Sequence, residues 1–231
     1  MTGNSEWSTN GPTLRADARR NRDRILAAAK EMFAERGPDA PMEEIARRAG
    51  VGVGTLYRRF PDREALLRAV TVDNFNGVVS DGRTAAAEEP NAWLALCRFV
   101  RECVESRMGV ALLPQSGRSS AIIRDDPHAR DAHLAMVKMV QGLVNAAKDE
   151  GALRDDVEAG DVVVLLSLLL RPVYHPTPEV GMVAAARSVT VVLDGLRARS
   201  AVSPLPGRSL TGDDLTPREP RAMADEHPEY R

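Results

Sequence analysis

The chain has 231 residues, of which 43% are hydrophobic, 28% charged and only 4% aromatic, and its formal net charge is −2. This composition is typical of a soluble globular protein with one large domain or two small ones. We expect no signal peptide, because residues 1–12 are polar, and no membrane span, because the longest apolar run, 162–170, is too short. With only two cysteines, Cys97 and Cys103, we expect a cytoplasmic protein.

The sequence predicts a helical N-terminal domain that ends at residue 62. Apolar residues recur at helical spacing in its first helix, and Gly37–Pro38 forms a helix stop. Pro41 is tolerated in the first turn of the next helix because it has no N–H group to leave unbonded. The expected elements are a flexible basic arm over 1–17 and helices over 18–36, 41–49 and 53–60. Arg15 lies in this arm, and Arg19 and Arg20 follow directly after it.

Helical spacing continues through a larger second domain, expected over residues 63–199. Asp62 is placed to cap its first helix, which we expect from Arg63 to Asp81 with a turn over 81–90. Further helices are expected over 91–108, within 109–127, and over 127–150, 161–171 and 180–199. The tail, 200–231, is rich in proline and has no apolar period, so it is predicted to be disordered. No strand pattern is present, and the predicted fold class is therefore all-α.

Residues 42–60 have the pattern of a helix-turn-helix, in which two helices cross steeply through a short turn. Ala46 supplies a small residue at the crossing, and Gly50 tolerates a positive φ in the turn. Leu56 and Phe60 are placed to anchor the second helix. On this spacing alone, a DNA-binding unit and a plain helical hairpin inside a bundle both remain open. The charge favours the first, because residues 12–68 hold 13 basic and 9 acidic side chains and residues 69–231 hold 18 and 23.

Three segments resemble the DNA-binding domain of the TetR (tetracycline-repressor) family: RILAAAKEMFAERG (24–37), MEEIARRAGV (42–51) and GTLYRRFPDREALL (54–67). The resemblance implies a three-helix helix-turn-helix domain followed by a larger helical domain that binds a small effector and dimerises. Residues 149–170 and the last helix are similar to the C-terminal domains called SbtR-like. The implied function is a repressor that binds a near-palindromic operator as a homodimer and is released by an effector of unknown identity. An activator, and a helical dimer that has lost DNA binding, are the alternatives.

The resemblance also implies which residues contact DNA. Gly52, Val53 and Gly54 match the N-terminal edge of the recognition helix, where many members carry Ser-Lys or Ser-Arg instead of Gly-Val. We therefore expect this edge either to read thymine methyl groups through Val53 or to use Arg58 instead. The other implied side-chain contacts are Thr55, Tyr57, Arg59 and Arg63, together with the backbone N–H of Met42 or Glu43 at a helix start. Arg19, next to the arm, either reaches an adjacent groove of the DNA or is a solvated charge.

An effector pocket is expected in the second domain, although core packing is the alternative for each of its candidate residues and is favoured for the aliphatic and methionine positions. Arg107 either meets an anionic effector or is exposed. An enzyme is not expected, because the four histidines are scattered and no metal-binding or phosphate-binding motif is present. No cofactor or metal is implied. The candidate pocket residues are Trp93, Leu96, Cys97, Val100, Cys103, Arg107, Met108, His133, Met136 and Val137.

Overall fold

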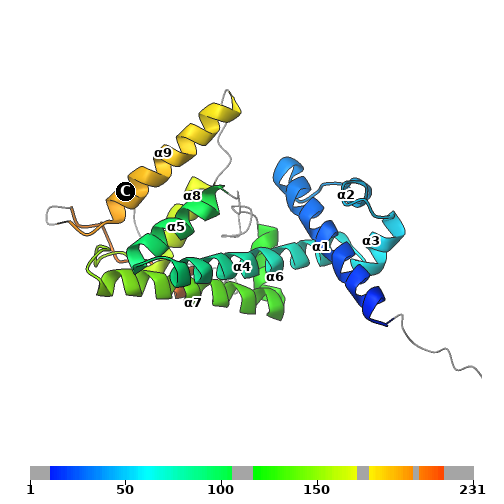
Figure 1. The fold of residues 1–231 in the computed structure, drawn as a ribbon, viewed down its shortest axis with the longest axis horizontal. Helices are drawn as coiled ribbons and strands as arrows, with labels where there is room; N and C mark the ends of the chain where they lie inside the picture. The colour runs from blue at the N-terminus through cyan, green and yellow to red at the C-terminus, as the bar shows by residue number, and fades with distance from the viewer. Residues whose placement is uncertain (1–10, 106–116, 171–176, 200–202, 216–231) are drawn as a thin grey trace, which may run out of the picture. The chain divides into compact units, whose positions relative to one another are not determined.

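The computed structural model describes residues 11–105, 117–170, 177–199 and 203–215 (Figure 1). In this part of the chain every regular element is helical, and the only β-type pairing is an isolated bridge between Leu153 and Arg197. The helices are α1 (Gly11–Arg36), α2 (Met42–Arg48), α3 (Val53–Arg59), α4 (Arg63–Glu88), α5 (Ala92–Glu105), α6 (Gly117–Asp125), α7 (Pro127–Asp149), α8 (Ala159–Leu169) and α9 (Pro178–Leu196). None of the described helices is long and apolar enough to cross a membrane. The all-α prediction is confirmed.

The chain divides into two compact units, residues 1–73 and 74–231, and the boundary lies inside α4. The first unit is built around one apolar core to which every helix contributes. Ile25 and Met32 of α1, Ile45 of α2 and Leu56 of α3 are all at most 1% exposed. Burial of these side chains on helices as short as α2 and α3 stabilises them, since helices of seven residues do not persist alone in water.

Two helix boundaries differ from the sequence prediction by seven residues each, and the others differ by less. Helix α1 begins at Gly11 and not at Ala18, so residues 11–17 of the predicted arm are helical; Pro12 fits because proline is tolerated in a first turn. Helix α4 continues to Glu88, through the predicted turn over 81–90. Gly82 was interpreted as part of that turn, but it is buried, and a Cβ at this position would lie 2.1 Å from Met139 Sδ. The glycine allows close packing of α4 on α7 and does not end the helix.

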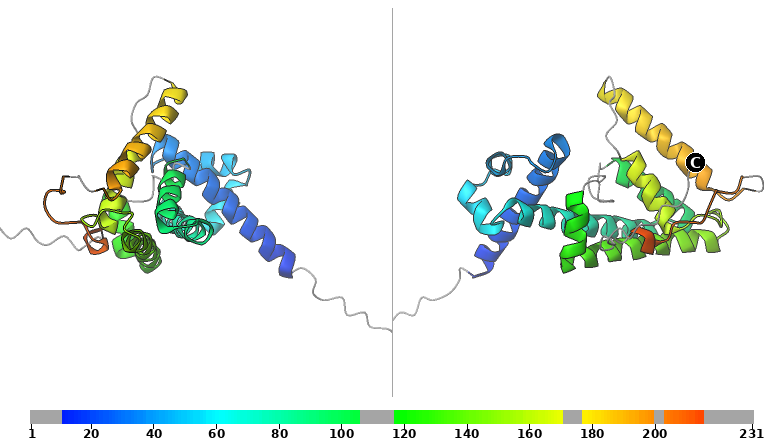
Figure 2. Two further views of the ribbon diagram at one scale, coloured as in Figure 1. Left: turned by 60° about the vertical axis from the view of Figure 1, so that its left-hand side comes forward. Right: turned by 180° about the vertical axis from the view of Figure 1, so that it is seen from behind.

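The second unit is a bundle in which α5 packs against α7, α8 and α9 (Figure 2). The helix starts are capped as their sequences require: Asp126 accepts a hydrogen bond from Ala129 N at 2.9 Å, and Glu158 forms a capping box with Asp161. Helix α9 packs mainly through its C-terminal half, where Leu193 and Leu196 are buried. Its N-terminal half extends away from the bundle (Figure 1).

The segment after α9 shows that the predicted disorder of residues 200–231 is wrong for residues 203–215, which we call the C-terminal strap. The strap lies against α7 and α8 and ends in a 3-10 turn, Gly212–Leu215. Leu205 N donates to Asp156 Oδ2 at 2.9 Å, and Leu210 N donates to Asp161 Oδ1 at 3.1 Å. These partners lie 49 residues earlier in the chain, so the local composition of the strap could not indicate them.

Candidate nucleic-acid interface and effector domain

The turn between α2 and α3 is held by backbone geometry and by α1. Gly50 has a φ of 62°, the left-handed conformation that glycine adopts without a steric penalty. Val51 N donates to Ala46 O at 3.0 Å, which closes the turn onto the small residue of α2. Arg24 Nη2 of α1 donates to Gly50 O at 2.9 Å. Gly50 and Ala46 follow from the local sequence pattern, but Arg24 does not, because a contact between distant residues leaves no local pattern.

Helix α3 presents one face to the core and the other to solvent. Leu56 is fully buried and Phe60 is 5% exposed, so both predicted anchors pack into the core of the first unit. On the opposite side Val53 is 39% and Tyr57 40% exposed, a large apolar exposure for so short a helix. Gly52 and Gly54 are also exposed, and Thr55 is half-buried. A rigid helix with an exposed edge of this kind fits the dimensions of the DNA major groove.

The arginines at the end of α3 are arranged differently from each other. Arg58 folds back along its own helix, where Nε donates to Gly54 O at 3.3 Å and Nη2 donates to Thr55 Oγ1 at 3.2 Å. Arg59 is exposed and has no hydrogen-bond or ion-pair partner among the described residues. All donors of Arg59 are therefore available to a phosphate, whereas two donors of Arg58 are used within its own helix.

Two other predicted DNA contacts are placed inside the first unit. The side chain of Met42 is only 4% exposed and belongs to the core, so only its backbone could reach DNA. Arg63 is half-buried, and its Nη1 donates to the carbonyl oxygens of Pro38 and Ala40, which fastens α4 to the loop between α1 and α2. Arg19 is exposed, but on the regular helix α1 and not on a flexible arm.

A carboxylate that the sequence analysis did not consider lies beside the exposed tyrosine. The hydroxyl of Tyr57 donates to Glu43 Oε1 at 3.3 Å, across the two helices of the helix-turn-helix. Glu43 is exposed at the start of α2. The pair orients the tyrosine ring, and it places a negative charge beside a group expected to approach phosphate.

The predicted effector residues of α5 and α7 form a densely packed core. Trp93, Leu96, Cys97 and Val100 of α5 are at most 8% exposed, as are Cys103 on the same helix and His133, Met136 and Val137 of α7. Burial raises the pKa of the Cys97 thiol, and it raises that of Cys103 to about 12, so both are neutral thiols. Arg107 and Met108 lie outside the described residues.

His133 is the exceptional member of this core. Its ring is fully buried, and neither Nδ1 nor Nε2 has a hydrogen-bond partner among the described residues. The edge of the ring meets Phe75 of α4, with centroids 5.3 Å apart and an interplanar angle of 68°. Burial lowers the pKa of His133 below its ordinary value, because no acceptor compensates the charged form. The imidazole is therefore neutral at pH 7.

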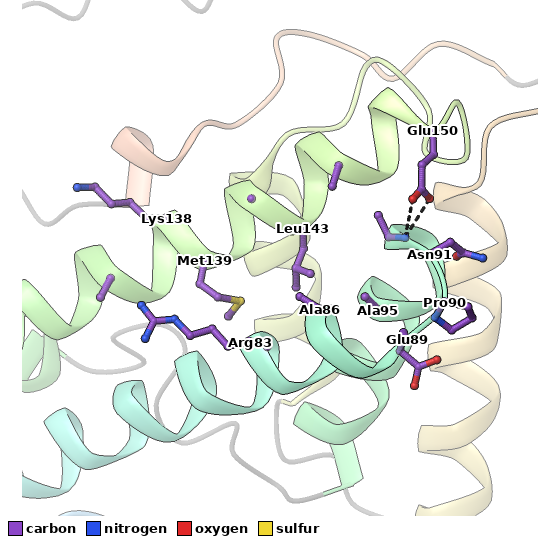
Figure 3. Close-up of a pocket in the computed structure, with 15 residues that line it drawn as sticks. Arg83, Ala86, Glu89, Pro90, Asn91, Ala95, Lys138, Met139, Leu143 and Glu150 are labelled. Carbon is purple, nitrogen blue, oxygen red and sulfur yellow. Dashed lines mark hydrogen bonds between the residues drawn. The ribbon is translucent and has the colours of Figure 1, made fainter.

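A groove of about 710 Å³ lies elsewhere in the second unit, between α4, the start of α5 and α7 (Figure 3). Of the residues predicted to bind an effector, none of those that the structure describes lines this groove. Its wall is made largely of small and flexible side chains, including Ala86 of α4, Ala95 of α5, and Met139 and Leu143 of α7. Periodicity alone could not indicate this groove, since alanines are equally compatible with tight helix packing.

Comparisons with known proteins agree with this architecture. Residues 25–70 match the family described as "Bacterial regulatory proteins, tetR family", and residues 90–198 match the "Transcriptional regulator SbtR-like, C-terminal domain". The TetR transcriptional regulator SCO0520 from Streptomyces coelicolor is 33% identical, with a TM-score of 0.60 over 78% of this chain and 99% of that chain. The TetR transcription regulatory protein from Mycobacterium vanbaalenii is 35% identical, with a TM-score of 0.56 over 80% and 99%. The HTH-type transcriptional regulator TtgW of Pseudomonas putida is 33% identical over 47% of this chain and 75% of its own length.

These matches define the class as helix-turn-helix transcriptional regulators. The chain belongs to the TetR family, with an SbtR-like C-terminal domain. The resemblance in the sequence analysis is confirmed at this level.

Proposed function

We propose that this protein is a transcriptional repressor that binds a near-palindromic operator as a homodimer and is released by a small effector bound in the second unit. The exposed edge of α3 is the observation that carries the proposal. It sits on a helix anchored by Leu56 and preceded by the Gly50 turn, so its side chains are presented on a rigid support. In this arrangement Val53 and Tyr57 face the major groove, and Arg59 meets a phosphate.

The homodimer is supported by apolar side chains on α8 and α9 that no described part of the chain covers. Met182 is 66%, Val183 58% and Val191 71% exposed on α9, and Leu168 of α8 is 54% exposed. Several large exposed apolar side chains on neighbouring helices favour a site of association. A twofold dimer requires the same patch on both copies, and it would place two α3 helices on successive half-sites of a near-palindrome.

A gel-shift experiment with the DNA immediately upstream of the protein's own gene tests DNA binding. We expect a specific shift with the full chain, and Tyr57→Ala should abolish it while Arg101→Gln, an exposed change on α5, should not. A wild-type protein that gives no specific shift even at low salt would contradict the proposal, because low salt favours phosphate contacts.

Sedimentation equilibrium tests the dimer separately. We expect Val183→Asp combined with Val191→Asp to give a folded monomer, since two charges cannot be buried unpaired in an apolar interface. A double variant that remains a dimer would exclude this face of α9 as the interface.

A further inference from the structure

The groove between α4 and α7 exists because its opposing side chains are too small to fill it. The two helices touch where Gly82 packs on Met139. Further along, the facing positions are Ala86 on α4 and Gly142 and Ala146 on α7, which leave open space above Leu143. The resulting volume of about 710 Å³ lies in the range of small-molecule sites, whose walls are predominantly apolar.

The acidic groups around this groove are already satisfied. The carboxylate of Glu150 accepts hydrogen bonds from Ala92 N at 2.8 and 3.0 Å and from Trp93 N at 3.3 Å, and it thereby caps α5 (Figure 3). Glu89 accepts a hydrogen bond from Arg98 Nη1 at 3.3 Å. Both carboxylates are therefore held by donors of the protein itself, at the end of the groove formed by the start of α5.

The basic groups at the other end are not satisfied. Arg83 of α4 and Lys138 of α7 line the groove, and neither has a hydrogen-bond or ion-pair partner among the described residues. Figure 3 shows the guanidinium of Arg83 between the two helices beside Met139, and Lys138 projecting outward from α7 at the same end. The groove therefore combines an apolar wall with uncompensated positive charge at one end.

We propose that this groove binds an amphipathic organic anion, with its acidic head at Arg83 and Lys138 and its apolar body along Ala86, Met139 and Leu143. Arginine suits a carboxylate because its planar fork donates two parallel hydrogen bonds, and the flexible lysine adds a second charge at the rim. Met139 can change rotamer to fit the apolar body of the ligand.

Occupancy of the groove links α7 to α4, the helix that begins in the DNA-binding unit at Arg63. Resting on the proposed repressor function, the inference is that this groove is the effector site. A ligand that bridges the two helices selects one position of α4 and so changes the population able to bind the operator.

Isothermal titration calorimetry of the full chain with decanoate, without DNA, tests the binding step. Decanol and decylammonium carry the same alkyl chain with a neutral or a positive head. We expect decanoate to bind about tenfold more tightly than decanol, because one charge-assisted hydrogen bond changes affinity by about this factor. Decylammonium should bind more weakly than either. No decanoate binding at millimolar concentration, or equal binding of decylammonium, would overturn the proposal.

Variants locate the site. Arg83→Gln combined with Lys138→Gln should weaken decanoate about tenfold and leave decanol unchanged. Ala146→Phe, which fills the groove from an exposed position, should weaken both ligands, and the control Arg101→Gln should affect neither. Decanoate affinity that is unchanged in both groove variants would show that the ligand binds elsewhere and overturn the assignment.

Operator binding with and without decanoate tests the regulatory step. The ligand should lower operator affinity for the wild type but not for the Arg83→Gln, Lys138→Gln variant. Bound decanoate that leaves operator affinity unchanged would overturn the effector assignment. If the wild type binds no operator at all, the repressor proposal fails, while the calorimetry still decides whether the groove binds the anion.

Discussion

The two units of this chain differ in the polar groups that they bury. In the N-terminal unit the buried side chains are apolar, and charged groups pair on the surface, as Arg48 does with Glu35 at 2.8 Å and Arg36 with Glu44 at 2.6 Å. The C-terminal unit buries His133, whose ring has no hydrogen-bond partner in the described part of the chain, and it uses the carboxylates of Asp156 and Asp161 to hold a distant segment. The first arrangement favours one rigid structure that presents side chains. The second leaves polar groups whose free energy depends on protonation and on what packs against them.

The largest expected effect is a loss of stability in the first unit when its anchor, Leu56, is truncated. Leu56→Ala removes a fully buried side chain beneath the exposed edge of α3 and should lower the free energy of unfolding by about 2–5 kcal/mol. Urea unfolding measures this loss, and gel shifts should show a parallel loss of DNA binding. The matched change Leu94→Ala, at a position 39% exposed on α5, should leave stability nearly unchanged. A small effect of Leu56→Ala would mean that the first unit is less tightly packed than described.

The second expected effect concerns the buried imidazole. His133→Leu removes two unsatisfied nitrogens from an apolar core and should stabilise the protein at neutral pH by about 1–2 kcal/mol. Thermal unfolding measures this gain. The same change at the exposed His128 provides the control. Destabilisation by His133→Leu would indicate that the imidazole has a compensating partner.

The pH dependence of stability gives the same group an independent test. Because burial lowers the pKa of His133 in the folded state, the unfolded chain binds more protons once the pH falls towards the ordinary histidine value of about 6.5. Stability should therefore fall as the pH drops through that value, and His133→Leu should flatten this part of the curve. An unchanged slope in the variant would assign it to another group.

The C-terminal strap should respond to the loss of one carboxylate. Arg154 Nε donates to Asp156 Oδ1 at 2.6 Å, and Arg154 Nη2 donates to Ser203 O at 2.8 Å, so Asp156 and Arg154 together fasten the strap. Asp156→Ala should increase hydrogen exchange and proteolysis within residues 203–215 several-fold, whereas Asp155→Ala, at the exposed neighbour, should not. Equal protection in both variants would mean that the contacts of Leu210 and Gly212 hold the strap without Asp156.

The pKa of Asp156 lies well below its ordinary range, first because of the hydrogen bond from Arg154 and then because of the one from Leu205 N. A carboxylate whose pKa is lowered on folding stabilises the fold above its unfolded pKa and loses this contribution as the pH falls. Acid should therefore release the strap in the wild type, which the same exchange experiment detects. Strap protection that stays constant into strong acid would contradict this dependence.

The smallest expected effect sharpens the role of the exposed α3 edge. Glu43→Gln removes a negative charge next to Tyr57 while keeping a group that can accept its hydrogen bond. DNA affinity should rise about threefold, in line with the modest energies of exposed charge pairs. Fluorescence anisotropy with labelled operator measures the change, and Glu105→Gln on α5 is the control. A fall in affinity would show that the carboxylate orients Tyr57 more than it repels phosphate.

Helix placement and the helix-turn-helix were determined by the sequence itself, because their signals are local. Helical periodicity, the stop at Gly37 and the cap at Asp62, which accepts a hydrogen bond from Ala65 N at 2.7 Å, depend on neighbours within a few residues. Gly50 and Leu56 likewise stand at fixed offsets that the crossing of two helices requires. This is why α2 and α3 are found within one residue of their predicted bounds.

Contacts between distant segments were decided only by the tertiary structure. Gly82 ends a helix in a local interpretation, yet it packs on Met139 in the middle of α4. The sequence predicts that Arg63 contacts a phosphate, but in the structure its guanidinium donates to the carbonyl oxygens of Pro38 and Ala40. The groove at Arg83 and the strap at Asp156 arise in the same way. Their chemistry depends on which residues meet across the fold, and that information is absent from any short window of the chain.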